Sequence, residues 1–140
     1  MAVVRIDTDR LDDVKAAVKA GLNRHNDSFL PSPRDPTPMA ISIRDEAGRV
    51  VGGLIGEFRL DWLYVDWLWV DEALRGSGYG KHLMERAEAE ARAAGLTHIY
   101  LWTWSFQAPD FYTALGYTEC GRIKDHPRGH DTIQFVKWLG

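Results

Sequence analysis

Apolar positions recur along the chain with two periods, one typical of helices and one typical of strands. Near the N-terminus, the apolar residues repeat at the spacing of one helix face: Leu11, Val14, Val18 and Leu22. Before them, Val3–Ile6 predicts a short opening strand, and Thr8 or Asp9 is a suitable N-cap for the helix. Beyond the helix, four prolines exclude regular structure and predict a loop: Pro31, Pro33, Pro36 and Pro38.

The next segments predict a β-hairpin. Met39–Arg44 and Arg49–Leu60 have strand character, and Asp45–Gly48 between them is a turn sequence. Three glycines lie inside the second strand: Gly52, Gly53 and Gly56. Glycines in such positions often mark a bulge or the close approach of another backbone.

A strand, a glycine-rich turn, a helix and a further strand follow. Trp62–Val70 is almost continuously apolar, so we expect it to be buried on both faces near the centre of a sheet. Arg75–Lys81 forms the turn, the helix ends at Gly95, and Thr97–Trp104 is the next strand. The apolar side of this helix carries Leu83, Met84, Ala87, Ala91 and Ala94. Such a crossover unit predicts two parallel strands.

The C-terminal part predicts one short helix and one more hairpin. Ala108–Leu115 has proline in its first turn and ends before Gly116. Tyr117–Ile123 and Thr132–Leu139 read as two strands around a polar turn. That turn, His126–Asp131, holds two histidines and an aspartate, but their spacing matches no zinc motif, so a hairpin loop is the favoured interpretation and no metal is predicted.

Composition narrows the class of protein. A chain of 140 residues without repeats or a linker predicts one domain, residues 1–140. The net charge of −3 lacks the basic footprint of nucleic-acid binding. Cys120 is the one cysteine, which excludes an intramolecular disulfide and a cysteine metal cluster. No apolar run is long enough to cross a bilayer and the N-terminus has no signal-peptide core, so we expect a cytoplasmic protein without a membrane partner.

Aromatic residues are numerous for this length, and most of the tryptophans lie on two predicted strands. Those five are Trp62, Trp67, Trp69, Trp102 and Trp104. Core packing is the favoured interpretation of each. An aromatic pocket for the acceptor is the sharper alternative, because a cation over an indole ring is attracted to it.

The turn at Arg75–Lys81 is the strongest candidate binding motif. Its glycines permit positive φ and a close ligand approach, and amides at a helix start suit a phosphate. A Walker sequence would need glycine at Arg75 and serine or threonine at His82. A dinucleotide fingerprint would need glycine at Lys81 or at Leu83. Both patterns fail, and spacing alone leaves a phosphate loop and a structural turn equally open.

The segment Arg75-x-x-Gly78-x-Gly80 resembles the coenzyme A pyrophosphate loop of the GNAT superfamily of N-acetyltransferases, whose pattern is Arg or Gln, x, x, Gly, x, Gly or Ala. The preceding Leu68–Asp71 resembles the strand end that leads into that loop. Ala108–Tyr117 resembles the second signature of the family, a helix that ends in Phe-Tyr-x-x-x-Gly-aromatic. With the element order, the resemblance covers Val3 to Leu139.

This resemblance implies an α/β fold of the α+β type, with a mixed, mostly antiparallel sheet of six or seven strands that splays between strands 4 and 5. Acetyl-CoA would be the co-substrate, and no metal is required. The backbone of Leu68, Trp69 and Val70 would pair with the pantetheine arm, and Arg75 would support the loop or touch a phosphate. The amides that would hold the pyrophosphate belong to Gly76, Ser77, Gly78, Tyr79, Gly80 and Lys81.

The same resemblance places catalytic groups. Tyr112 matches the general acid that protonates the thiolate, and Phe111 would pack beside the coenzyme. Ser105 stands where many relatives carry asparagine, and a serine would make a similar but shorter hydrogen bond there; Gln107 nearby is the alternative for this role.

The general base has three candidates. Asp66 is the one ionised residue in an apolar strand, where burial would raise its pKa, although an aspartate that only holds a hydrogen bond fits equally well. Glu57 on the neighbouring strand is the second candidate, and a chain of water molecules is the third.

The predicted function is direct transfer of an acetyl group from acetyl-CoA to a primary amine in a ternary complex. A small-molecule acceptor is favoured over a protein lysine or N-terminus, and a non-catalytic acyl-CoA-binding module is a further alternative. Homodimers are common in the family, and we expect one here by resemblance alone.

Overall fold

The computed structural model describes residues 1–140 as two compact parts, Met1–Arg34 and Asp35–Gly140. The first part contains one helix, α1 (Leu11–Asn26), whose residues are all at least partly exposed. Residues 3–6 are not a strand, contrary to the prediction, because no neighbouring strand pairs with them. The N-cap of α1 is Arg10, and no side chain caps the helix, so the expected cap by Thr8 or Asp9 is also wrong.

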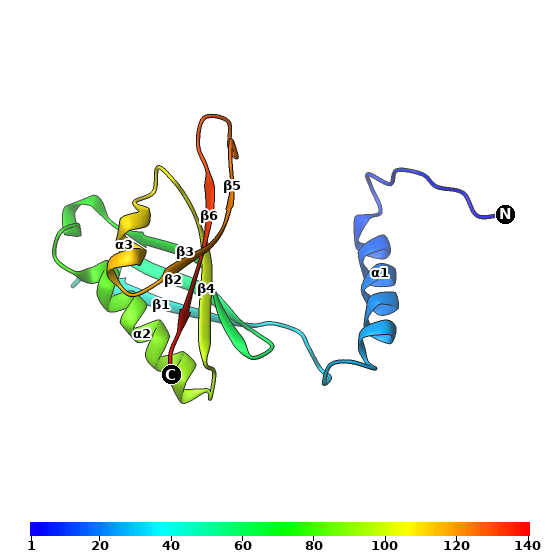
Figure 1. Ribbon diagram of the computed structural model, residues 1–140, viewed down its shortest axis with the longest axis horizontal. Helices are drawn as coiled ribbons and strands as arrows, with labels where there is room; N and C mark the ends of the chain where they lie inside the picture. The colour runs from blue at the N-terminus through cyan, green and yellow to red at the C-terminus, as the bar shows by residue number, and fades with distance from the viewer. The chain divides into compact units, whose positions relative to one another are not determined.

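The second part is built on a six-stranded sheet in the order β1-β2-β3-β4-β6-β5 (Figure 1). Its strands are β1 (Thr37–Arg44), β2 (Val50–Arg59), β3 (Trp62–Val70), β4 (His98–Trp104), β5 (Thr118–Ile123) and β6 (Thr132–Trp138). Only β3 and β4 are parallel, and every other pair is antiparallel. The predicted mixed, mostly antiparallel sheet and its parallel crossover are confirmed.

Two helices and a helical turn complete this part. The 3-10 turn η1 (Glu72–Leu74) follows β3, α2 (Tyr79–Ala93) makes the crossover to β4, and α3 (Pro109–Ala114) follows β4. Both helices contribute to the same apolar core, so they cover the same face of the sheet (Figure 1). The core takes Leu83, Met84, Ala87 and Ala91 from α2 and Tyr112 from α3.

The glycines inside β2 mark close backbone contacts, as predicted. A Cβ at Gly56 would lie 2.6 Å from the carbonyl oxygen of Tyr64, and a Cβ at Gly53 would lie 2.8 Å from the carbonyl oxygen of Ile41. The register between β2 and β3 shifts at Gly56, which pairs with Val65 while Ile55 pairs with Trp67. A glycine is therefore needed where the neighbouring strand bulges.

Burial along β3 differs from the prediction of a strand covered on both faces. Leu63 and Val65 are buried, whereas Asp66, Trp67 and Trp69 are exposed. Core packing is likewise wrong for the tryptophans: none belongs to the core, and Trp67, Trp69, Trp102 and Trp104 are all exposed. These rings lie on the face of the sheet opposite α2. No helix of the Asp35–Gly140 part covers that face, so the rings are exposed.

Candidate functional site

A bulge in β3 opens the sheet between its two parallel strands. Asp66 is the extra residue of the bulge, since its neighbours Val65 and Trp67 pair with consecutive residues of β2. Pairing between β3 and β4 ends at Val65 and Leu101, although both strands continue. A bulge adds twist and ends strand pairing. The two strand ends therefore diverge. The splay was predicted between strands 4 and 5, and these are β3 and β4 here because the strand expected at residues 3–6 is absent.

The diverging ends enclose a cleft of about 850 Å³. Residues from β3, the glycine turn, β4 and α3 line it: Asp66, Trp67, Leu68, Trp69, Val70, Leu74, Arg75, Gly76, Gly78, Tyr79, Gly80, Lys81, Trp102, Thr103, Phe106, Gln107, Ala108, Phe111 and Tyr112. Most of the residues singled out in the sequence are thus brought together. Glu57, Ser77 and Ser105 are not among the lining residues.

One wall of the cleft is the unpaired edge of β3. Leu68, Trp69 and Val70 pair with β2 on one side and have no strand on the other, because β4 has diverged. Such an edge presents backbone N–H and C=O groups that can pair with an extended ligand, as a peptide strand does in β-augmentation. The pantetheine arm of coenzyme A, which carries two amide groups, is extended in this sense.

The glycine turn forms the positively charged end of the cleft. Gly76 (φ 82°) and Gly78 (φ 84°) adopt left-handed conformations, and Gly78 is the N-cap of α2. No side chain caps this helix, so its first amides are available to an anion. Arg75 and Lys81 line the same end, and the Arg75 Nε donates to the Val70 carbonyl oxygen at 3.3 Å. This bond holds the arginine against the end of β3.

Helix α3 lies beside the glycine turn. The ring of Phe111 is so close to Gly80 that a Cβ there would lie 3.3 Å from two ring carbons. Phe111 therefore fixes the distance between the first turn of α2 and the start of α3. Both residues line the cleft.

Tyr112 is a buried tyrosine whose hydroxyl has no protein partner. The residue is only 8% exposed, and burial raises its pKa to about 12. No hydrogen bond to another residue involves its hydroxyl, yet no buried side-chain oxygen of the protein lacks a partner. The hydroxyl must therefore be open to the cleft that the residue lines. It is protonated at neutral pH and is free to donate.

Tyr117 is the contrasting neighbour, with its ring centroid 6.0 Å from that of Tyr112. Its hydroxyl donates to the Glu88 carboxylate at 3.2 Å, and burial together with that carboxylate raises its pKa far above the ordinary value. Tyr117 does not line the cleft. Of these two buried tyrosines, only Tyr112 can offer a proton to a ligand in the cleft.

Ser105 has a structural partner outside the cleft. Its amide donates to the Asp131 carbonyl oxygen at 2.9 Å, and its hydroxyl accepts from the Asp131 amide at 2.9 Å. These bonds tie the end of β4 to the start of β6. Gln107 lines the cleft instead, and its Oε1 accepts from the Trp104 amide and the Thr103 hydroxyl at 3.1 and 3.2 Å.

The two carboxylates proposed as bases have different surroundings. Asp66 lines the cleft but is exposed, so the prediction that it is buried is wrong. Its carboxylate accepts a hydrogen bond from the Tyr64 hydroxyl at 3.5 Å. Glu57 is ion-paired with Arg59, whose guanidinium lies 4.1 Å from the centroid of the Tyr64 ring. The bulge explains the exposure of Asp66, because its extra residue breaks the alternation of buried and exposed positions.

Four lining residues were not singled out in the sequence: Leu74, Thr103, Phe106 and Ala108. Phe106 is the aromatic residue that directly follows the tryptophan-rich strand, and that proximity is the signal that could have found it. Ala108 is the N-cap of α3 and has a positive φ of 68°, which an alanine rarely adopts. No local pattern in the sequence marks Leu74 or Thr103.

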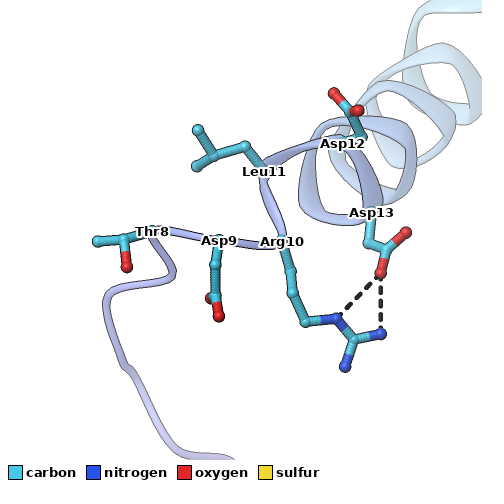
Figure 2. Close-up of a pocket in the computed structure, with 6 residues that line it drawn as sticks. All are labelled: Thr8, Asp9, Arg10, Leu11, Asp12 and Asp13. Carbon is cyan, nitrogen blue, oxygen red and sulfur yellow. Dashed lines mark hydrogen bonds and ion pairs between the residues drawn. The ribbon is translucent and has the colours of Figure 1, made fainter.

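A second hollow lies in the Met1–Arg34 part, at the start of α1. Residues 8–13 line it, and the Arg10 guanidinium donates to the Asp13 carboxylate at 3.2 and 2.8 Å (Figure 2). Leu11 points away from this ion pair (Figure 2). Both side chains of this ion pair are exposed, so the pair contributes little to the stability of the helix start.

The structure contains neither a metal-binding cluster nor a membrane-spanning helix. No group of three histidine, cysteine, aspartate or glutamate side chains could hold a metal ion. The turn between β5 and β6 instead hydrogen-bonds internally, with His126 Nδ1 2.7 Å from the Thr132 hydroxyl. None of the helices has both the length and the apolar character needed to cross a membrane.

Comparisons with known proteins agree with this geometry. The model of the Acetyltransferase (GNAT) family matches residues 11–117. A blasticidin-S acetyltransferase of Streptomyces morookaense is 45% identical over 95 residues, which are 67% of this chain and 70% of that protein. The crystal structure of an acetyltransferase from Bacillus cereus is 33% identical, with a TM-score of 0.88 over 98% of this chain and 97% of that one.

A further solved structure shares the fold at lower identity. It is a Bacillus anthracis protein in complex with acetyl coenzyme A, 17% identical, with a TM-score of 0.64 over 80% of this chain and 66% of that one. The family match, the 45% identity and the arrangement of glycine turn, splayed strands and cleft lead to the same conclusion. This chain belongs to the GNAT family of acetyltransferases.

Proposed function

We propose that this protein transfers the acetyl group of acetyl-CoA to a primary amine of a small molecule. The observation that carries the proposal is the protonated, unpartnered hydroxyl of Tyr112 at the cleft between the separated ends of β3 and β4. A proton donor is needed where a thiolate leaves, and the cleft offers one beside an anion-binding turn.

The residues present fit coenzyme A. The first amides of α2, with Arg75 and Lys81, would bind the pyrophosphate, and the edge of Leu68–Val70 would pair with the pantetheine amides. Acetyl-CoA supplies an activated thioester, so the chain needs neither a metal nor a covalent intermediate. Binding both substrates in one cleft contributes much of the rate through positioning.

Two proton transfers accompany the reaction. The amine nitrogen bonds to the acetyl carbon while the carbon–sulfur bond breaks, and Tyr112 gives its proton to the leaving sulfur. Asp66 is the proposed acceptor of the amine proton, directly or through water, because it is the carboxylate that lines the cleft. Glu57 is a weaker candidate, since Arg59 already neutralises it.

The similarity to blasticidin-S acetyltransferase supports a small-molecule acceptor. The 45% identity extends over two thirds of this chain and 70% of that relative. Blasticidin S is therefore the first acceptor to test, followed by a panel of amines and a lysine-containing peptide.

The test joins a binding measurement to a rate measurement. Calorimetric titration should detect acetyl-CoA but not ATP, and thiol release should depend on an added small amine. Tyr112→Phe should lower kcat by roughly 10²-fold while the affinity for acetyl-CoA stays within about two-fold. Tyr117→Phe, which removes the neighbouring buried hydroxyl that does not line the cleft, is the matched control and should keep its rate. Absence of acetyl-CoA binding, or acetylation of the peptide alone, would refute the proposal.

A further inference from the structure

Charge is distributed unevenly along the cleft. Its two cationic side chains, Arg75 and Lys81, lie at the glycine turn, while its one carboxylate, Asp66, lies where β3 and β4 separate. The strand between Asp66 and Val70 spans roughly 13 Å at about 3.3 Å per residue. The end that suits an anionic coenzyme is therefore well separated from the end that carries negative charge.

Three aromatic side chains line the same cleft where β3 and β4 separate. Trp67 comes from β3 immediately after the bulge, Trp102 from β4, and Phe106 from the turn after β4. Their exposed fractions are 69%, 39% and 54%. In β4 the residues on either side of Trp102 are buried, so its ring emerges on the face of the sheet opposite α2 and α3. Large exposed rings gathered at one site usually mark a binding surface.

The turn that carries Phe106 is held in place. The Phe106 ring stacks on Trp104 with 5.4 Å between the ring centroids, and it meets the His130 ring edge-on with 4.7 Å between centroids. The two hydrogen bonds between Ser105 and Asp131 fix the same turn to β6. The aromatic wall, defined as Trp67, Trp102 and Phe106, is thus partly preorganised for a ligand.

We propose that this aromatic wall, beside Asp66, is the acceptor subsite and that the acceptor carries a cationic group besides the amine that is acetylated. The inference rests on the proposed function. The faces of indole and phenyl rings attract cations, and a carboxylate beside them adds to the attraction. The attacking amine must be neutral when it reacts, so the bound charge belongs to a second group such as a guanidinium or ammonium.

Binding can test this without turnover. Monoacetyl-1,5-diaminopentane keeps one ammonium group and is already acetylated, while N-pentylacetamide is its neutral counterpart. Titration should show that the charged compound binds at least ten-fold more tightly. Trp102→Leu should reduce that preference to about two-fold, while Trp102→Phe should retain most of it. Trp138→Leu, an exposed tryptophan outside the cleft, is the control and should leave the preference unchanged.

The outcomes separate this inference from the proposed function. Equal affinities, no measurable binding of either compound, or tighter binding of the neutral aromatic N-(3-phenylpropyl)acetamide would overturn the cation subsite even if acetyl transfer occurs. A preference for the charged compound that Trp102→Leu removes would support the subsite even if no amine is acetylated. With turnover, Trp102→Leu should raise KM for 1,5-diaminopentane about ten-fold and leave KM for acetyl-CoA unchanged.

Discussion

At the scale of single residues, two neighbouring tyrosines show how a partner decides a role. Tyr112 and Tyr117 are similarly buried, but the Tyr117 hydroxyl is committed to Glu88 while the Tyr112 hydroxyl is open to the cleft. The sequence could indicate Tyr112 through its family signature. It could not indicate that Asp66 is exposed, because that depends on a bulge formed opposite Gly56 on another strand.

The raised pKa of Tyr112 predicts a loss of stability at alkaline pH. Its pKa is about 12 in the folded protein and 10.0 in the ordinary state, so the unfolded chain loses this proton first as pH rises. The stabilising contribution is intact below pH 10 and declines between about pH 10 and 12. Between pH 9 and 11, the unfolding free energy of Tyr112→Phe should therefore fall by about 1 kcal/mol less than that of the wild type.

Chemical denaturation at pH 9 and pH 11 measures this difference. Burial and Glu88 also raise the pKa of Tyr117, so a residual alkaline loss is expected in Tyr112→Phe. Identical pH dependence of the two proteins would show that the Tyr112 hydroxyl ionises in the folded state as easily as in the unfolded one.

At the scale of elements, local patterns predicted what local geometry determines. The strand–turn–helix–strand unit at residues 62–104 and the final hairpin required only apolar periodicity and glycines. The strand expected at residues 3–6 failed because a strand forms only with a partner, which no local pattern specifies. The predicted burial of Trp67 and Trp69 was wrong for the same kind of reason, since the bulge reverses the alternation of buried and exposed positions along β3.

The glycine turn offers a prediction with a matched control. Gly78 (φ 84°) and Gly48 (φ 84°) share a left-handed conformation, and a Cβ at either would meet no atom within 4 Å. Gly78→Ala and Gly48→Ala should therefore each lower the unfolding free energy by about 1 kcal/mol through backbone strain alone. Only Gly78→Ala should also weaken acetyl-CoA binding, by about ten-fold, because it displaces the first amides of α2.

Thermal denaturation and calorimetric titration of the two variants separate strain from binding. Gly48 lies in the turn between β1 and β2 and does not line the cleft. Equal affinity of both variants for acetyl-CoA would mean that the turn shapes the chain without contacting the coenzyme.

At the scale of the whole molecule, one buried ion pair joins α2 to the C-terminal strands of the Asp35–Gly140 part. The Lys137 ammonium lies 2.6 Å from the Glu88 carboxylate and donates to the Leu115 carbonyl oxygen at 2.8 Å. Glu88 is only 6% exposed, although helical spacing places Arg92 one turn further along α2 as a nearer partner in the sequence. An ion pair between residues that are far apart in the sequence produces no local pattern from which it could be predicted.

Replacing one partner of this ion pair should lower the unfolding free energy more than replacing both. Lys137→Met leaves a buried carboxylate with only the Tyr117 hydroxyl, so the unfolding free energy should fall by about 3–5 kcal/mol. The double variant Lys137→Met/Glu88→Gln has no buried charge and should regain at least half of that loss. Arg86→Met, which breaks the exposed pair with Glu90 on the same helix, should change stability by less than about 1 kcal/mol. Urea denaturation of these proteins and of the single variant Glu88→Gln provides the test, because additive losses in the double variant would mean that the carboxylate is hydrated rather than trapped.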